Sequence, residues 1–312
     1  MKSKIFFPIF LWIMLLTFQK SFSQEAKQDS VYFITTKDGN TISGTLHEKN
    51  EKQISITTKN FGTVAVQRDS IKQLQVLPPT SYKNGKFFFP NPNATRYFLS
   101  PSAIPLKKGE GYFQNTYVLF NSINYGITDN ISLGAGIDVI TPFVKDIGGP
   151  FMLLTLKAGF KVAEKFHIAG TTIFIHAPYL GEADYKNEST FLMEDASFTY
   201  GSADYNITLG ASYGLNGGEL MNGPSFTLSA MARVTPRFSF VTENWMFPVT
   251  HYQYSYLTST DSVTGTSYKG FVSYGMRFMS QKIAVDLAFI NNGDIIQNIA
   301  IGIPYVDFVV KF

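Results

Sequence analysis

The sequence contains no cysteine, which excludes a fold held together by disulfide bonds. Its formal net charge is only +3, too small to indicate a nucleic-acid ligand. Beyond residue 23 it has no apolar run close to the roughly 20 residues that a membrane-spanning helix needs. Aromatic residues are plentiful instead, at 15% of the chain. Abundant aromatics without long apolar runs favour a structure built from β-strands.

The first 23 residues have the pattern of an export signal. Two lysines precede an apolar run over residues 5–18, and Ser21 and Ser23 supply the small residues of a cleavage site. We therefore expect residues 1–23 to be a signal peptide and Gln24 to begin the mature chain. The alternative, a membrane-anchoring helix, needs a longer run than this one. No cysteine follows the run, so attachment of lipid at this point is excluded.

Residues 24–80 are predicted to form a small periplasmic β-domain. The stretch "VYFITTKDGNTISGTLHEK" is typical of two strands joined by an Asp-Gly turn, and three short strands are expected after it. The spacing of Gly39 and Gly44, with Leu46 and Ile54 after them, resembles the start of an Sm-like or SH3-like barrel. Sm relatives bind RNA, which is not an expected ligand for an exported segment. We expect a compact module with no nucleic-acid ligand and with a periplasmic protein as its candidate partner.

Residues 81–94 are rich in Pro, Asn and Gly, which indicates a linker. Over residues 95–312 apolar and polar residues alternate in segments of about ten, such as "YNITLGASYG" and "KIAVDLAFI". Short connectors alternate with long ones, which is typical of a transmembrane β-barrel with tight periplasmic turns and long outer loops. We count 12 antiparallel strands from near Arg96 to Phe312. Ten strands are the alternative, because residues 111–127 fit either one strand or two.

The polar face of the strands distinguishes a membrane barrel from a soluble β-sandwich, because the strands of both alternate. Glycine recurs on that face among small hydroxyl residues, at positions 134, 136, 159, 210, 214 and 275. Small residues suit the crowded inner wall of a closed sheet. Aromatic residues close to the short turns, such as Tyr125 and Phe166, fit a girdle at the membrane surface. We therefore predict an all-β protein whose outer-membrane barrel turns its apolar face toward lipid.

Charged residues of both signs fall on the predicted inner face. They are Lys157, Lys161, Arg233, Arg277, Asp138, Asp286 and Glu243. Basic side chains that line a narrow pore would give it a preference for anions. Alternatively, the bases pair with the acids and fill a closed lumen, because unpaired buried charge is costly. Pairing is the interpretation that we favour.

The final strand, "VDFVVKF", places four apolar residues at alternate positions: Val306, Phe308, Val310 and Phe312. An open sheet edge in lipid would leave backbone groups without hydrogen bonds, so we expect this strand to pair with the first. The ending resembles the carboxy-terminal assembly signal of outer-membrane proteins, which implies the barrel-assembly machinery as a partner during biogenesis. The blocks "NSINYGITDNISLGAGIDVI" and "YFLSPSAIPLKKGEGYFQNTY" also resemble a family of uncharacterised Gram-negative outer-membrane barrel proteins. This second resemblance covers residues 95–312 and implies no substrate.

Few residues offer catalytic chemistry. None of the four histidines has the His-x-Ser context of barrel phospholipases. His176, with Glu182 and Asp184 after it, is the one candidate for a hydrolytic site at the outer rim, but a histidine without a catalytic role is the simpler interpretation. Without cysteine or a His-x-x-x-His pattern, the sequence indicates no metal site and no cofactor. We therefore predict that the protein is not an enzyme.

The most distinctive outer loop is predicted over residues 248–267, where Tyr252, Tyr254 and Tyr256 stand among Ser and Thr residues. Exposed aromatics of this kind can hold a sugar or an apolar ligand. They can equally fold back as a lid over the barrel mouth, which we favour.

The sequence thus predicts a cell outer-membrane β-barrel, exported by a cleaved signal peptide and embedded in outer-membrane lipid, with its amino-terminal module in the periplasm. The favoured function is a porin-like channel or uptake protein for a small solute, with the long loops gating the lumen. The alternative is a structural or assembly-linked barrel whose periplasmic module docks a partner. A hydrolase at the rim is the weakest hypothesis.

Overall fold

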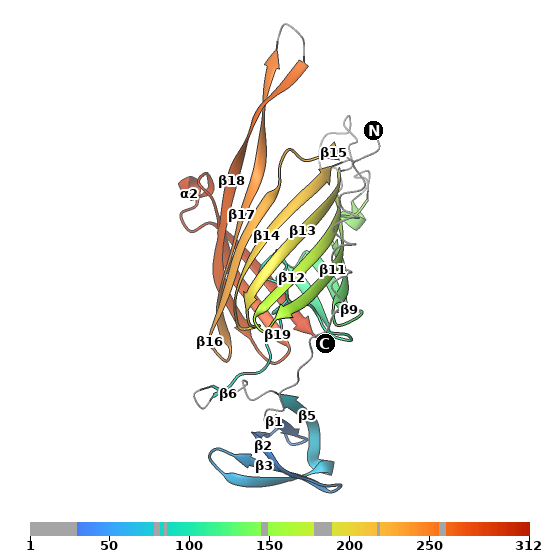
Figure 1. Cartoon of the computed structure of the whole chain (residues 1–312), viewed down its shortest axis with the longest axis vertical. Helices are drawn as coiled ribbons and strands as arrows, with labels where there is room; N and C mark the ends of the chain where they lie inside the picture. Colours follow the sequence, from blue (N-terminus) through green and yellow to red (C-terminus); the bar gives the residue numbers. More distant parts are fainter. Residues whose placement is uncertain are drawn as a thin grey trace. The chain divides into compact units, whose positions relative to one another are not determined.

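The computed structural model describes residues 30–77, 82–83, 86–144, 149–177, 189–216, 219–255 and 260–312. The chain divides into two compact units at the junction between Pro90 and Asn91. The smaller unit contains the amino-terminal β-domain, and the larger contains the barrel (Figure 1).

The amino-terminal unit contains a five-stranded antiparallel meander whose last strand returns to pair with the first. Its strands are β1 (Val31–Thr36), β2 (Thr41–Lys49), β3 (Gln53–Thr58), β4 (Gly62–Gln67) and β5 (Ile71–Leu77), in the spatial order β4-β3-β2-β1-β5. The β1–β2 turn has Gly39 at φ +90°, a conformation that glycine adopts without a steric penalty. Ile34, Ile54, Ile56 and Val66 form its buried core. A 3₁₀ turn (Arg68–Ser70) precedes β5, and a separate two-stranded ribbon joins β6 (Tyr82–Lys83) to β7 (Lys86–Phe87).

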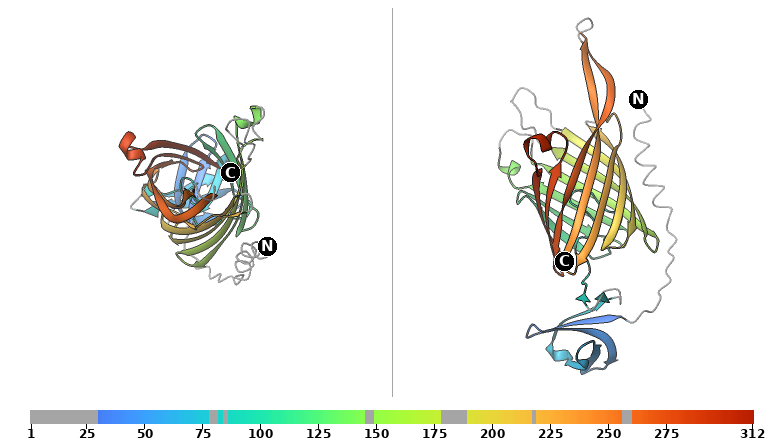
Figure 2. Two further views of the ribbon diagram at one scale, coloured as in Figure 1. Left: turned by 90° about the horizontal axis from the view of Figure 1, so that it is seen from above. Right: turned by 90° about the vertical axis from the view of Figure 1, so that its left-hand side faces the viewer.

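The larger unit is a closed barrel of 12 antiparallel strands (Figure 2). They are β8 (Gly111–Thr116), β9 (Phe120–Gly126), β10 (Ile131–Asp138), β11 (Met152–Ala163), β12 (Phe166–Ala177), β13 (Ser189–Gly201), β14 (Tyr205–Asn216), β16 (Ser225–Thr235), β17 (Phe238–Ser255), β18 (Thr260–Met279), β19 (Ile283–Asn291) and β20 (Ile303–Lys311). Three small elements lie in its connections: a 3₁₀ turn (Thr141–Phe143), β15 (Glu219–Leu220) and α2 (Ile295–Asn298).

Pairing of β20 with β8 closes the barrel, as expected from the apolar alternation of the final strand. Asp307 lies opposite Thr116, and Lys311 lies opposite Tyr112. The backbone groups of Gly111 and Phe312 exchange two further hydrogen bonds of 2.9 and 3.1 Å. Every strand of the barrel therefore has a neighbour on both sides, which a sheet surrounded by lipid requires.

The barrel has its apolar side chains outside and its polar side chains inside. On β14, for example, Ile207 and Leu209 are exposed, whereas Asn206, Thr208 and Ser212 are buried. The same exposed rows continue around the barrel through Leu133, Leu154, Leu228, Met276, Leu287 and Phe308. This inside-out distribution identifies an outer-membrane type of barrel rather than a water-soluble sandwich. No helix in the described part of the chain is long and apolar enough to cross a membrane.

The strand assignment differs from the sequence prediction at two places. The first barrel strand begins at Gly111, not near Arg96, and residues 111–126 form the two strands β8 and β9. Their connection, Tyr117-Val118-Leu119, is tight, so the predicted alternation of short and long connectors fails there. Second, most of the loop predicted over residues 248–267 is strand: β17 and β18 form a hairpin that extends beyond the other strands (Figure 1).

Candidate functional site: a plugged lumen with a cavity

The predicted linker and first strand contain instead a segment that fills part of the barrel interior. This segment, residues 91–106, is called the plug here. Asn93, Tyr97, Phe98, Ser102 and Ala103 each have at most 1% of their surface exposed. Apart from an isolated bridge between Arg96 and Pro101, the plug belongs to no strand pair, so its backbone N–H and C=O groups need other partners. Charged side chains of the inner wall supply many of them.

Glu243 of β17 binds the amide groups at the tip of the plug. Its Oε2 accepts hydrogen bonds from the backbone N–H groups of Phe98, Leu99 and Ser100 at 2.9–3.0 Å, and from the Ser100 hydroxyl at 2.9 Å. Its Oε1 accepts one from Trp245 Nε1 at 2.7 Å. Successive N–H groups that converge on one carboxylate oxygen form an anion-binding nest. The plug therefore compensates the buried negative charge of Glu243 without a basic residue.

Arg277 of β18 binds the carbonyl groups on the other side of the same segment. Its Nε and Nη2 form a bidentate ion pair with Asp286 of β19 at 2.7 and 2.8 Å. Nη2 also donates to Tyr97 O at 2.8 Å, and Nη1 donates to Asn93 O and Arg96 O. A guanidinium has five N–H donors in a fixed plane, and this arrangement uses all three nitrogens at once.

Lys157 of β11 holds the end of the plug. Its Nζ donates to Ser102 O at 2.6 Å and to Ile104 O at 2.7 Å, with a longer contact of 3.4 Å to Thr95 O. Gly159 allows the plug to approach the wall here, because a Cβ at this position would lie 3.0 Å from Ala103 O. A buried ammonium is costly unless its donors are satisfied, and three carbonyl groups satisfy this one.

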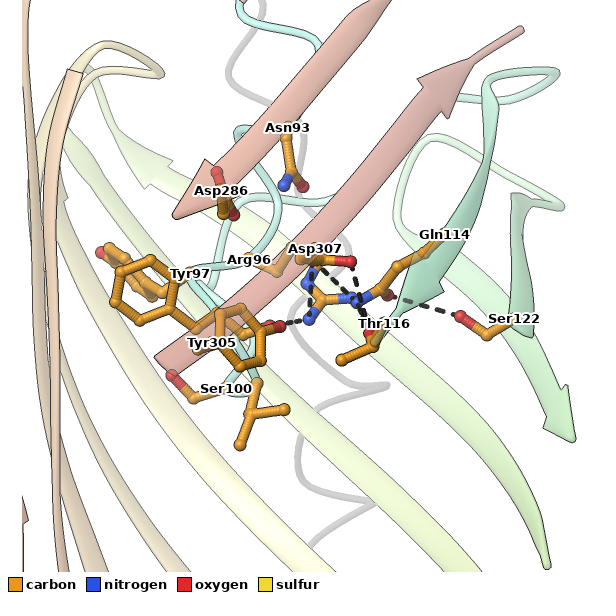
Figure 3. A network of polar contacts seen from close by, with 12 residues as sticks. Asn93, Arg96, Tyr97, Ser100, Gln114, Thr116, Ser122, Asp286, Tyr305 and Asp307 are labelled. Atoms are coloured by element: carbon orange, nitrogen blue, oxygen red, sulfur yellow. Dashed lines mark hydrogen bonds and ion pairs between the residues drawn. The ribbon is translucent and has the colours of Figure 1, made fainter. Parts of the chain in front are cut away.

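The plug contributes a cation of its own, Arg96, which points toward β20 and β8 (Figure 3). Its guanidinium lies 3.8 Å from Asp307 and donates to Phe98 O. Asp307 also accepts hydrogen bonds from Gln114 at 3.0 Å and Thr116 at 3.3 Å. Charged side chains of the wall thus bind the plug, and a charged side chain of the plug in turn binds the wall.

Aromatic side chains complete the contact between plug and wall. Tyr97 and Phe98 pack in one buried cluster with Met231, Val241, Ala288 and Tyr305. The Tyr97 hydroxyl lies 2.6 Å from both Asn206 Oδ1 and Thr208 Oγ1, and the Tyr305 hydroxyl donates to Phe98 O at 2.9 Å.

The remaining predicted lumen charges lie away from the plug. Arg233 is buried near the short turns, where it pairs with Asp204 at 2.8 Å rather than with any of the predicted acids. Lys161 alternates in step with the inward-facing residues of β11, but it lies near the end of the strand and is exposed. Asp138 is only half-buried at the opposite end of β10, where its carboxylate accepts the backbone N–H groups of the connection to β11. Lys161 and Asp138 therefore do not take part in the charge network that the sequence suggested.

A cavity of about 690 Å³ occupies the barrel interior beside the plug. Plug residues 95–101 except Tyr97 line one side of it, and the tip residue Leu99 is 58% exposed. Polar wall residues next to the plug include Gln114, Thr171 and Asp195.

Toward the ends of the strands that bear the long connections, the inner wall becomes apolar. The inward rows continue there with Phe120, Phe151, Leu153, Ile173, Ile175, Met193, Trp245, Phe247 and Phe271, all of which line the cavity. The lumen thus has a polar half, which the plug partly fills, and an apolar half, and the cavity extends from the plug into the apolar half.

Sequence reasoning missed both the plug and the apolar half. The plug had one visible signal: "NPNATRYFLSPSAIP" does not alternate with period two. The apolar half had another, since "IFI" at residues 173–175 and "WMF" at residues 245–247 are apolar on both faces of a strand. A transmembrane strand with two apolar faces has an apolar interior beside it.

The predicted loop aromatics and rim histidine fall in the outer part of the barrel. Tyr252 and Tyr254 belong to β17, opposite Val263 and Asp261 of β18, and Tyr256 lies outside the described residues. His176 lies on β12 opposite Met152 and Thr190, while Glu182 and Asp184 lie outside the described residues.

Comparison with known proteins gives structural neighbours only. The sequence matches no protein-family model, and no curated protein proves to be similar. Among solved structures, the trimer form of OmpT, an outer-membrane protein of Vibrio cholerae, is 10% identical over 91% of this chain and 95% of its own, with a TM-score of 0.34. A loop-deletion mutant of the same protein is 9% identical, covers 91% and 96%, and has a TM-score of 0.35. The NanC porin is 7% identical over 65% of this chain and 97% of its own, with a TM-score of 0.37. The fold assignment therefore rests on the strand pairing and the outward apolar surface of this chain.

Proposed function

We propose that this barrel is an uptake channel for a small solute, and that the plug is its gate in the closed state. The observation that carries the proposal is the binding of the plug backbone by Glu243, Arg277 and Lys157 beside a cavity able to hold a solute. These contacts are hydrogen bonds to an irregular segment rather than strand pairs, so the segment can leave without opening the barrel wall. The proposal assigns no catalytic role to the protein.

Planar-bilayer conductance tests this function. Replacement of residues 94–104 by a Gly-Ser linker of equal length keeps the tether but removes the side chains and the turn that the wall binds. We expect the unaltered protein to conduct little and the plug-replaced variant to show discrete channels. Lys161→Ala is the matched control, because it removes an exposed cation that does not contact the plug. A plug-replaced barrel that inserts into the bilayer and still does not conduct would contradict the proposal.

One observation favours a second role, in which the amino-terminal module docks a periplasmic partner. The plug follows Pro90 directly, so a partner that holds the module is linked through the chain to the gate. Phe61 at the β3–β4 turn is 82% exposed and offers an apolar contact. A photo-crosslinker at Phe61 in the full chain, expressed in cells, should capture a defined protein. Under this role the signal peptide is cleaved at residue 23 and the module lies in the periplasm.

Recognition by the barrel-assembly machinery is part of the same proposal. In β20 the residues Val306 and Phe308 face outward, while Tyr305, Asp307 and Val309 are buried inside. An outward row of this kind is accessible to a partner before the barrel closes. Phe308→Ser should therefore slow assembly in cells more than it lowers the stability of the folded barrel.

A further inference from the structure

Three residues that line the cavity have a buried polar atom without a hydrogen-bond partner among the described residues: Arg96 Nε, Asp195 Oδ2 on β13 and Thr171 Oγ1 on β12. Arg96 is already paired with Asp307, which leaves Asp195 and Thr171. The two residues lie directly opposite each other in the strand register, both line the cavity, and their side chains are at most 5% exposed. Facing residues on paired strands have Cβ atoms roughly 5 Å apart, so one small group can reach both. A buried carboxylate oxygen without a donor is costly, which indicates that something else supplies the donor.

The neighbours of Asp195 restrict what kind of ligand group can donate a hydrogen bond to its carboxylate. The Lys157 ammonium acts on Asp195 electrostatically, but its hydrogen bonds go to plug carbonyls. Two further hydroxyl groups lie near Asp195: Ser197, two residues along the strand, acts on the carboxyl as a weak hydrogen-bond donor, and Ser212 lies opposite it on β14. Neither hydroxyl is within hydrogen-bond geometry of Asp195 Oδ2. An ammonium ligand would meet the positive charge of Lys157, and a carboxylate ligand would meet the negative charge of Asp195. A neutral hydroxyl avoids both repulsions. A hydroxyl can also donate a hydrogen bond to the Asp195 carboxylate and at the same time accept one from the Thr171 hydroxyl.

The rest of the cavity is suited to an apolar body. Ile173 and Ile175 continue the row of Thr171, and Met193 continues the row of Asp195. Trp245, Phe247 and Phe271 line the cavity from β17 and β18. The volume of about 690 Å³ falls within the roughly 300–1,000 Å³ that is typical of small-molecule sites.

We propose that the cavity binds an uncharged lipophilic alcohol, with its hydroxyl between Asp195 and Thr171 and its apolar body against the aliphatic and aromatic wall. This inference names the class of solute for the proposed uptake function and rests on that function for its biological meaning. The binding itself is a property of the closed barrel and is measured without transport.

Fluorescence of Trp245 tests the proposal directly. The sequence has two tryptophans, Trp12 and Trp245, so a chain that begins at Gln24 has a single tryptophan, located at the cavity. A brominated ligand quenches tryptophan fluorescence on contact. The probes are 11-bromoundecan-1-ol, its methyl ether, 11-bromoundecylamine and 11-bromoundecanoate, added to the barrel in lipid vesicles. We expect saturable quenching by the alcohol, with half-saturation at a concentration about tenfold or more below that of the ether, which cannot donate to Asp195.

Three variants keep the result interpretable. Asp195→Asn and Thr171→Val should each reduce the preference for alcohol over ether, and two independent variants guard against failure of one to fold. The double variant Trp245→Phe, Leu228→Trp moves the reporter to an outward, 44% exposed position and measures partition of each probe into lipid. Its quenching should be weak, linear in probe concentration and equal for alcohol and ether.

Other outcomes would overturn the proposal in distinct ways. Equal quenching by alcohol and ether would show an apolar site without hydroxyl recognition. Tighter binding of the amine would show a cation site at Asp195. Absence of saturable quenching by any probe would show that the cavity does not bind lipophilic molecules. None of these results depends on conductance. The quenching experiment therefore tests ligand binding by itself, and the conductance experiment tests the uptake function by itself.

Discussion

The two halves of the lumen use the same inward-facing rows of residues for opposite purposes. Near the plug, Glu243 and Arg277 each bind several backbone groups of the plug. Their other hydrogen bonds go to the Ser100 hydroxyl, Trp245 and Asp286. Farther along the same strands, Trp245 and Phe271 line open space. A polar interior has to be filled, because charge without a partner is costly there, whereas an apolar interior can stay empty for a ligand. Under the proposed function, the polar half closes the channel and the apolar half binds the solute.

The largest expected effect comes from breaking the polar half at Arg277. Arg277→Met removes three plug contacts and leaves Asp286 buried without its ion-pair partner. We expect a loss of about 3–5 kcal/mol in the free energy of unfolding. Urea unfolding in lipid vesicles, followed by Trp245 fluorescence, measures it.

The double variant Arg277→Met, Asp286→Leu isolates the cost of the unpaired charge. It should recover much of the stability but not the closure of the plug, because the plug carbonyls still lack their donor. Equal stability of Arg277→Met and the unaltered protein would contradict the described network.

A smaller effect is expected from Glu243→Gln, which removes the negative charge that the plug amides bind. Because the chain has no cysteine, Ser102→Cys introduces a unique label in the plug at a position only 1% exposed. We expect its maleimide labelling to be slow when Glu243 is intact and about tenfold or more faster in the Glu243→Gln variant, in line with a loss of about 1.5–3 kcal/mol. A cysteine at exposed Ser280 is the matched control and should react equally in both backgrounds.

The smallest effect is expected in the apolar half. Ile173→Ser changes a side chain that is only half-buried and faces the cavity. We expect a change of less than about 1 kcal/mol in stability and no change in the labelling of Ser102→Cys. Quenching of Trp245 by 11-bromoundecan-1-ol should weaken at the same time. An increase in plug labelling would show that the two halves are coupled rather than separate.

Much of the barrel could be predicted from the sequence because each strand repeats one simple rule. Alternation places Leu209 outside and Thr208 inside whatever the neighbours are, and the short turns fix where the strands end. The pairing of β20 with β8 follows from the need to leave no edge in lipid.

The plug could not be predicted in the same way, because its structure depends on contacts between residues far apart in sequence. Residues 98–100 take their shape from a carboxylate more than 140 residues away. The alternation with period two predicted that Glu243 and Arg277 face the lumen. It could not show whether their partners there were side chains or backbone groups. The same alternation wrongly placed Lys161 and Asp138 in the lumen. It shows which face of a strand a residue is on, but not whether that part of the strand encloses the lumen or lies at its end.

The order of contacts along the plug has a mechanical consequence. From the amino-terminal side, Asn91 donates a hydrogen bond to Ala203 O, and Arg277 then binds carbonyl groups within residues 93–97. Glu243 binds residues 98–100, and Lys157 binds Ser102 and Ile104, with a longer contact back to Thr95. Traction applied at Pro90 meets these attachments one after another, so the segment unzips at a force set by the strongest single attachment. Without a pulling force, spontaneous release of the plug must instead break all of these contacts together. If the plug is the gate that we propose, the barrel stays closed at rest and opens under a sustained pulling force at its amino-terminal side.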